Sequence, residues 1–143
     1  MTDGTAVAIA GSDGAIQACF PVMVQLRPHL RAEEFVPRVR RQMDAGFRLV
    51  ALSEGGAVKA VAGFRLSENL VFGRFMYVDD LVTDAHSRSA GHGRVLFDWL
   101  VRHARENGCS HLELDSGVQR FDAHRFYLRQ RMVLRSHHFS LKL

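Results

Sequence analysis

Cysteine is scarce in this chain of 143 residues, which contains only Cys19 and Cys109. The two lie far apart and match no metal-binding or redox spacing, so a reducing environment is expected. Long apolar runs are lacking too: the longest covers a few residues, whereas a membrane-spanning helix needs roughly 20. The first residues include an acid where a signal peptide has basic residues. We therefore expect a cytoplasmic protein with no membrane partner and no signal peptide.

Positive charge is present but not concentrated. The net charge is +4 and the sequence pI is about 9.7, which would suit a nucleic-acid partner. The arginines are spread along the chain, however, and aromatic residues do not alternate with them as a base-stacking surface requires. A solvated surface or a small anionic ligand explains the charge better, so no nucleic-acid partner is expected.

Metal-binding spacing is lacking among the eight histidines. His137 and His138 are adjacent, so on a strand they would face opposite sides, and the others show no helical or zinc-finger pairing. No metal site is predicted.

What is present is the pattern of one globular domain. Hydrophobic residues make up 47% of the chain, and repeats, low-complexity tracts and linkers are absent. The length suits a single domain over residues 1–143. Residues 5–10 resemble a short strand. Helical patterns follow over residues 13–26 and 31–44, and Pro37 inside the second pattern predicts a late start or a kink.

The remaining chain alternates between strand and helix patterns. Residues 47–54 and 57–66 flank Gly55-Gly56, which predicts a hairpin. The other expected elements are strands over residues 72–83, 110–116 and 133–143 and helices over residues 94–107 and 121–130. Together they predict an α/β (α+β) fold with a mixed, mostly antiparallel central sheet flanked by helices. The final strand could pair two copies into a homodimer, or Lys142 could protect it as an edge.

A glycine-containing loop, RSAGHG over residues 88–93, leads from the third strand into a helix. Such a loop offers free N–H groups at the positive end of a helix dipole, and glycine lets a phosphate approach them. A dinucleotide fingerprint needs a third glycine where Leu96 stands, and a P-loop needs Gly-Lys-Ser/Thr. Either the loop holds another anion or its glycines merely form a turn between solvated Arg88 and Arg94.

This loop resembles the Arg/Gln-x-x-Gly-x-Gly/Ala signature of the GNAT N-acetyltransferase superfamily. The preceding VDDLVTDAHS and the downstream LELDSGVQRFDAHRFYLRQRM, with Ala123 and Tyr127, are similar to that family as well. The resemblance covers residues 47–143 well and implies a GNAT-like domain with acetyl-CoA as co-substrate. The loop amides would hold its pyrophosphate, and the preceding strand would pair with its pantetheine arm. The cofactor-binding residues so implied are Leu81, Val82, Thr83, Arg88, Ser89, Ala90, Gly91, His92, Gly93 and Arg94.

Acetyl transfer to an amine needs an acceptor for the amine proton, a donor to the carbonyl oxygen and a proton donor for the leaving thiolate. The resemblance implies that the N–H near Val82 serves the carbonyl oxygen and that Tyr127, beside the sulfur, is the general acid. Without the resemblance, a buried core tyrosine would be the simpler interpretation. The side chain of His92 either lies by the phosphates or faces solvent.

Three carboxylates are candidates for the base. Asp79 and Asp80 are consecutive on a strand, so only one is expected to face the cleft, and Asp79 shares the parity of Leu81 and Thr83. By resemblance, Asp79 matches a position that is acidic in relatives acting on small amines or polyamines. Glu113 matches the catalytic glutamate of relatives that acetylate protein N-termini, or is a solvated carboxylate. We favour Asp79 narrowly, and a water chain without a single base stays open.

Two positions depart from the family pattern. Arg120 stands where many members have Asn, seven residues before the tyrosine, and Arg131-Met132 replaces Gly-Phe after the last helix. A left-handed residue other than glycine costs roughly 1 kcal/mol, so either Arg131 is strained or the helix ends differently.

The predicted function is an acetyl-CoA-dependent N-acyltransferase that acetylates a primary amine of a small molecule or peptide by direct attack in a ternary complex. The alternative is a non-catalytic acyl-CoA-binding or regulatory module, against which Tyr127 and the carboxylates argue. The N-terminal helices should shape the acceptor pocket. They carry cations together with Glu33 and Glu34, so the charge of the acceptor stays open.

Overall fold

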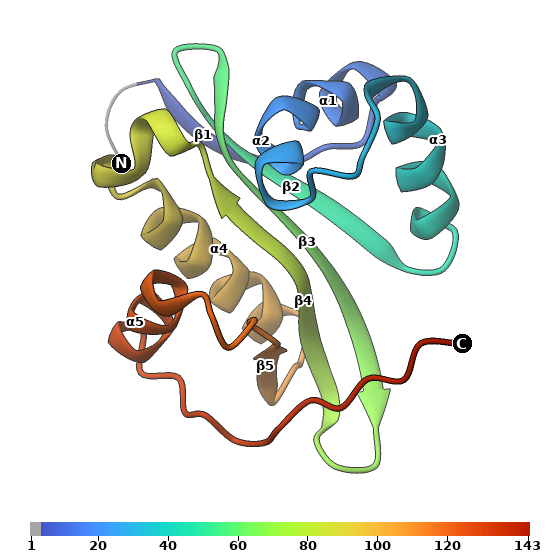
Figure 1. Ribbon diagram of the computed structural model, residues 1–143, viewed down its shortest axis with the longest axis vertical. Helices are drawn as coiled ribbons and strands as arrows, with labels where there is room; N and C mark the ends of the chain where they lie inside the picture. Colours follow the sequence, from blue (N-terminus) through green and yellow to red (C-terminus); the bar gives the residue numbers. More distant parts are fainter. Residues whose placement is uncertain (1–3) are drawn as a thin grey trace. The chain divides into compact units, whose positions relative to one another are not determined.

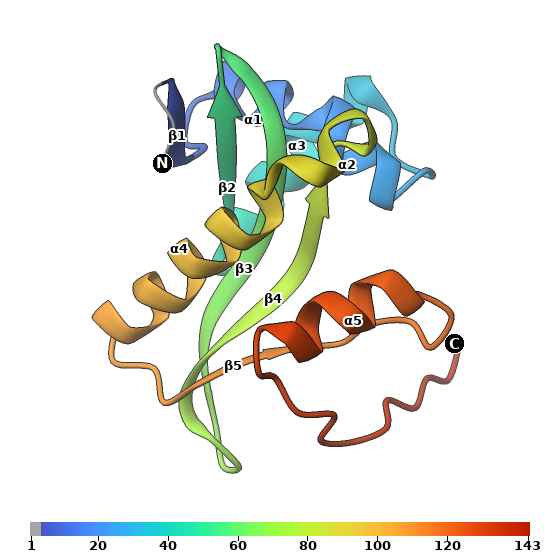
Figure 2. The same ribbon diagram turned by 90° about the vertical axis from the view of Figure 1, so that its left-hand side faces the viewer.

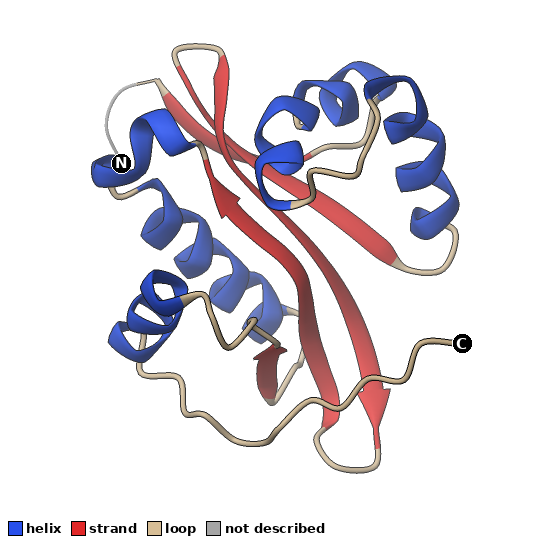
Figure 3. Cartoon of the chain, in the orientation of Figure 1, coloured by secondary structure: helices blue, strands red, loops and turns tan. Residues whose placement is uncertain are grey.

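The computed structural model describes residues 4–143, and the chain divides into two compact units, Met1–Glu113 and Leu114–Leu143. Figures 1 and 3 show the helices and strands of each unit. The elements are β1 (Thr5–Ile9), α1 (Asp13–Ala18), α2 (Phe20–Leu26), α3 (Ala32–Met43), β2 (Phe47–Glu54), β3 (Ala57–Asn69), β4 (Gly73–Thr83), the 3₁₀ helix η1 (Ala85–Ala90), α4 (His92–Glu106), β5 (His111–Leu114) and α5 (Phe121–Arg129).

The sheet is the frame of the first unit. Its strands lie in the order β1-β2-β3-β4-β5, and the pairs β1–β2, β2–β3 and β3–β4 are antiparallel. The predicted hairpin is confirmed: Gly55 and Gly56 join β2 to β3 with φ values of 60° and 80°. A two-residue hairpin turn of this kind needs positive φ at both positions, which glycine adopts without a steric penalty. The predicted mixed, mostly antiparallel sheet flanked by helices is therefore confirmed.

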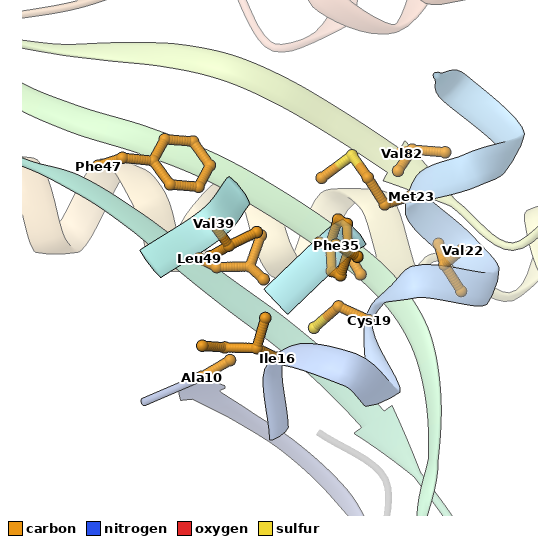
Figure 4. Close-up of a cluster of buried hydrophobic side chains, with 11 residues drawn as sticks. Ala10, Ile16, Cys19, Val22, Met23, Phe35, Val39, Phe47, Leu49 and Val82 are labelled. Carbon is orange, nitrogen blue, oxygen red and sulfur yellow. The ribbon is translucent and has the colours of Figure 1, made fainter. Parts of the chain in front are cut away.

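Helices cover both faces of this sheet. In Figure 2, α1, α2 and α3 lie on one side of the sheet and α4 lies on the other. On the α4 side, the fully buried ring of Phe64 packs edge-on against Trp99, at 6.0 Å, and His103, at 5.3 Å. On the other side, apolar side chains from α1–α3 and the sheet form the cluster drawn in Figure 4: Ala10, Ile16, Cys19, Val22, Met23, Phe35, Val39, Phe47, Leu49, Val61 and Val82.

Some helix boundaries differ from the sequence-based expectation. The single helix expected over residues 13–26 is two helices, because Pro21 has no N–H to donate to the Gln17 carbonyl and the chain breaks at Cys19. α3 begins at Ala32 and contains Pro37, so the late start predicted from that proline is not observed. α4 begins at His92, two residues before the expected position.

A β-bulge interrupts the pairing of β3 with β4. Gly63 lies opposite Asp80 and Phe64 lies opposite Val78, so Asp79 has no partner residue on β3. A bulge breaks the alternation of side chains along a strand. The expectation that only one of Asp79 and Asp80 faces the cleft is therefore wrong: both line the same cavity.

The second unit contains α5 and the C-terminal segment. α5 ends in a Schellman motif, in which the Arg131 N–H donates to the Leu128 carbonyl and the Met132 N–H to the Tyr127 carbonyl. Arg131 has a φ of 68°, so this arginine does take the left-handed conformation that favours glycine.

The prediction of a strand over residues 133–143 is wrong, because this segment has no regular secondary structure. Phe139, Leu141 and Leu143 alternate with polar residues as a strand would, yet all three are highly exposed. Alternation predicts which side chains share a face, whereas a strand also needs a neighbouring backbone to pair with. Within residues 4–143, no helix is long and apolar enough to cross a membrane.

Candidate active site

The loop that follows β4 is held by a helix and by the sheet. The Gln25 side chain of α2 donates to Asp84 at 3.0 Å, and the Gln25 oxygen accepts from the Ala85 N–H at 2.9 Å. The Asp84 N–H donates to the Lys59 carbonyl of β3 at 2.8 Å. The hydrogen bond from Gln25 is the main reason that the pKa of Asp84 lies below its ordinary value. These contacts fix the start of η1, which contains Arg88, Ser89 and Ala90.

The N-terminus of α4 presents free backbone donors. Gly91 adopts a left-handed conformation, with φ of 79° and ψ of 10°, and is the N-cap of this 15-residue helix. Gly91 itself has no side chain to cap this end, and the first amide bonded back into the helix is that of Val95, to the Gly91 carbonyl at 3.2 Å. The amides of His92, Gly93 and Arg94 therefore stand without helical acceptors at the positive end of the helix dipole.

The residues around this helix end fit the pyrophosphate of coenzyme A. A Cβ atom built on Gly91 would meet no other atom within 4 Å, so the approach to the amides is open. Arg88 and Arg94 are exposed on either side of Gly91 and supply positive charge. Free amides, a helix dipole and two guanidinium groups together form a site that favours a diphosphate. The cofactor-binding role of these residues stays a prediction.

His92 has a structural role that its place in the loop does not suggest. Its side chain is only 5% exposed, and its Nε2 lies 3.4 Å from Oε2 of Glu54 at the end of β2. Thr5 of β1 donates to the same carboxylate at 3.1 Å. The contact with His92 is the main cause of the lowered pKa of Glu54. The alternative of a solvent-facing His92 is wrong: the side chain fastens the start of α4 to the sheet.

The predicted arm-binding residues Leu81, Val82 and Thr83 form the end of β4. They pair on one side with β3, opposite Ala62, Val61 and Ala60 respectively. On the other side, β5 meets the opposite end of β4, where the Ser110 N–H donates to the Arg74 carbonyl at 2.9 Å. Figures 1 and 2 both show the arrowhead of β4 well away from β5. The short β5 therefore lies beside the start of β4 and not beside its end.

A cavity of about 440 Å³ opens between α2, α3 and the sheet. Its size is within the range of small-molecule sites. Its apolar lining overlaps the buried cluster of Figure 4 at Met23, Phe35, Val39, Phe47 and Leu49. Its other lining residues are Arg27, His29, Leu30, Arg38, Gln42, Tyr77, Asp79 and Asp80.

Both aspartates of the cavity are held by arginines. Arg65 Nε donates to Asp79 Oδ2 at 3.0 Å, and Arg27 Nε donates to Asp80 Oδ1 at 2.7 Å. A second Arg27 nitrogen donates to the Asp79 carbonyl at 3.0 Å, which ties α2 to the bulge. Burial raises the pKa of the Asp79 carboxyl, and the hydrogen bond and charge of Arg65 oppose this rise. Asp79 is therefore a carboxylate of increased basicity beside an open cavity.

The other two catalytic candidates lie elsewhere. Glu113 is half-buried on β5 and does not line the cavity, and its side chain makes no hydrogen bond or ion pair within the described part of the chain. Tyr127 lies on α5, in the second unit, where burial raises the pKa of its hydroxyl and the charge of Arg120 opposes that rise. The structure brings Asp79 and Asp80 together. The roles of Asp79, Glu113 and Tyr127 stay predictions.

Several residues of this region carried no recognisable sequence signal. Arg27 and Arg65 are 53 and 14 residues from the aspartates that they pair with. Pairs of this kind form only because the sheet and α2 bring distant segments together. Glu54, at the end of a strand, likewise carried no sequence signal, and only the register of β2 brings it into contact with His92.

Comparisons with known proteins agree with this geometry. The profile of the Acetyltransferase (GNAT) family matches residues 16–131. An uncharacterized N-acetyltransferase of Bacillus subtilis (strain 168), YhdJ, is 37% identical over 109 residues, which are 76% of this chain and 77% of that protein.

Solved structures share the fold at low identity. A transcriptional regulator from Bacillus halodurans C-125 aligns with a TM-score of 0.85 and 18% identity over 97% of this chain and 99% of its own. An aminoglycoside N-acetyltransferase in complex with CoA aligns with a TM-score of 0.84 and 11% identity over 100% of this chain and 98% of its own.

Proposed function

Because the chain belongs to the Acetyltransferase (GNAT) family, we propose that it moves an acetyl group from acetyl-CoA to a primary amine of a small molecule or peptide. In this proposal residues 1–143 act as one functional domain, and the amine attacks the thioester directly while both substrates are bound. The observation that carries the proposal is a left-handed Gly91 that opens the N-terminus of α4, at the end of a loop that follows a strand with a half-buried carboxylate, Asp79, at a cavity.

The donor side of the proposal rests on the loop. The amides of His92, Gly93 and Arg94, with the guanidinium groups of Arg88 and Arg94, would hold the pyrophosphate. The end of β4 would pair with the pantetheine arm through its backbone, on the side where β5 meets only the start of β4. A structural neighbour that contains CoA supports the choice of an acyl-CoA donor. Bound in this way, acetyl-CoA supplies an activated acyl group.

The residues of the chain then transfer protons and stabilise the charge that develops during the reaction. Asp79 accepts a proton from the attacking amine, directly or through water, because its burial favours the protonated form. The backbone N–H near Val82 donates to the carbonyl oxygen as negative charge develops on it. The new C–N bond forms as the C–S bond breaks, and Tyr127 returns a proton to the thiolate. Glu113 is the second candidate for the base.

Two measurements on the full chain test the proposal. CoA should raise the melting temperature, and acetyl-CoA with a panel of primary amines should release free thiol. Replacing Gly91 with Val, which strains a φ of 79° and places a side chain over the amides, should abolish the stabilisation by CoA. Stabilisation by CoA without thiol release on any amine would indicate a binding module instead. If CoA does not stabilise the protein and no amine gives thiol release, the proposal is contradicted altogether.

A further inference from the structure

Arg38 lines the cavity between α2, α3 and the sheet, and it has no ionic partner within the described part of the chain. The cavity holds two negative side chains, Asp79 and Asp80, and two positive ones, Arg27 and Arg38. Arg27 pairs with Asp80, and Asp79 pairs with Arg65, which lies outside the lining. Within each of these two pairs the positive and negative charges cancel. Within residues 4–143, no carboxylate lies in salt-bridge range of Arg38, which is half-buried on α3.

The balance of charge decides which acceptors the cavity favours. A half-buried guanidinium without a carboxylate keeps its full charge and its five donors, so it attracts a carboxylate or phosphate of a ligand. His29 at the same cavity adds another group able to bond to such a ligand. A polycationic acceptor would instead meet Arg38 without a free carboxylate to offset its charge, since Asp79 and Asp80 are already paired.

The shape of the cavity supports the same conclusion. Its volume of about 440 Å³ suits a compact molecule. Phe35, Val39, Phe47 and Leu49 give it an apolar floor that is continuous with the buried cluster (Figure 4). The carboxylate of Asp79 comes from β4, whereas Arg38 comes from α3, so opposite charges reach the cavity from different elements.

We infer that the acceptor is a small primary amine that also carries an anionic group, a carboxylate or a phosphate, with its amine toward Asp79 and its anion toward Arg38. This inference rests on the proposed function, because it assigns the cavity to the acceptor of the acetyl group. It makes Arg38 a specificity-determining residue, which the exposed Arg41 of the same helix is not.

Matched acceptors separate the anion from the amine. Thiol release from acetyl-CoA is measured with leucine against leucinamide, with phosphoethanolamine against ethanolamine, with a series of ω-amino carboxylates against alkylamines of equal length, and with spermidine. The wild-type protein should prefer the anionic member of at least one pair, by about 10- to 100-fold in kcat/KM, because a charged hydrogen bond is at stake. The carboxylate and phosphate pairs show which anion is recognised.

Variants of Arg38 then assign the preference to this residue. Arg38→Gln should reduce the preference by about 10- to 100-fold, mainly through KM of the anionic acceptor, and Arg38→Lys should keep part of it. Arg41→Gln is the matched control and should keep the wild-type preference. Because each variant meets the same two acceptors, differences in the amine pKa between the acceptors cancel in the comparison.

The outcomes distinguish this inference from the function on which it rests. Two results overturn the inference and leave the acetyltransferase function standing. One is that spermidine or the amines without an anionic group have a kcat/KM equal to or better than that of the anionic acceptors. The other is a preference that Arg38→Gln leaves intact. If no amine of the panel supports thiol release, both the inference and the proposed function are overturned.

Discussion

Replacing Asp79 with Asn removes the candidate base and keeps the size of the side chain and an oxygen that can accept from Arg65. Burial raises the pKa of the Asp79 carboxyl, so its ionised form is a stronger base than a solvated carboxylate. A positioned general base contributes about 10²- to 10⁴-fold to a rate. We therefore expect the kcat/KM of Asp79→Asn to fall by about 100-fold or more at pH 7.

The loss should depend on pH in a defined direction. Below the pKa of the acceptor amine nearly every acceptor molecule is protonated and needs a base, whereas above it the free amine attacks unaided. The ratio of wild-type to variant kcat/KM should therefore shrink as the pH rises from 7 to 10. A variant profile parallel to that of the wild type would refute the assignment of Asp79 as the base.

Stability should change little in this variant. The pKa of folded Asp79 is raised, so its favourable contribution to folding is present below its unfolded pKa and is lost as the pH rises through the folded value. At pH 7 the variant loses the partly exposed ion pair with Arg65, worth about 1 kcal/mol or less, and is relieved of the burial of a charge, which offsets that loss.

The assay measures thiol release between pH 6 and 10, with stabilisation by CoA as a check on folding and donor binding. Glu113→Gln tests the second candidate for the base, which lies outside the cavity. A loss that depends on pH in Glu113→Gln, but not in Asp79→Asn, would transfer the role of base to Glu113.

Three further changes probe the framework of the site. Gly63→Ala should destabilise the protein by about 1–3 kcal/mol in urea unfolding and raise the KM for the acceptor. The reason is that the new Cβ would overlap the Phe47 ring, which lines the cavity. An unchanged KM would contradict this packing. Arg131→Gly should raise the free energy of unfolding by about 1 kcal/mol, because glycine adopts a φ of 68° without strain, and a loss of stability would contradict the Schellman geometry. Glu54→Gln should lower the melting temperature at pH 7 but not at pH 3. The pKa of Glu54 is lowered by contact with His92, so its contribution is lost as the pH falls through the folded value; melting curves that stay apart at pH 3 would argue against this.

Features set by neighbouring residues could be predicted from the sequence. Gly55-Gly56 predicted a hairpin because both turn positions need positive φ, and the structure has that turn. The RSAGHG segment predicted an open helix N-terminus because its glycines allow a left-handed entry and leave the amides uncovered, and Gly91 has this conformation at the start of α4. The resemblance of residues 47–143 to one family was sufficient to predict the fold.

Features that depend on distant segments could not be predicted in this way. The pairing of Asp79 with Arg65 and of Asp80 with Arg27 joins β4 to β3 and to α2. The bulge at Asp79 is a property of two paired strands, and alternation along one strand placed Asp80 on the wrong face. The alternating C-terminal residues 133–143 were expected to form a strand, but a strand needs a partner that its own sequence does not supply.

The sequence by itself therefore determined the open helix end that is the proposed donor site, because turn glycines and free helix amides are local properties of a short segment. Only the tertiary structure decided the cavity that is proposed for the acceptor. The cavity, its paired aspartates and Arg38 lie together because α2, α3 and the sheet pack against one another. Charges separated by tens of residues can balance each other only after the chain has brought them within a few ångströms.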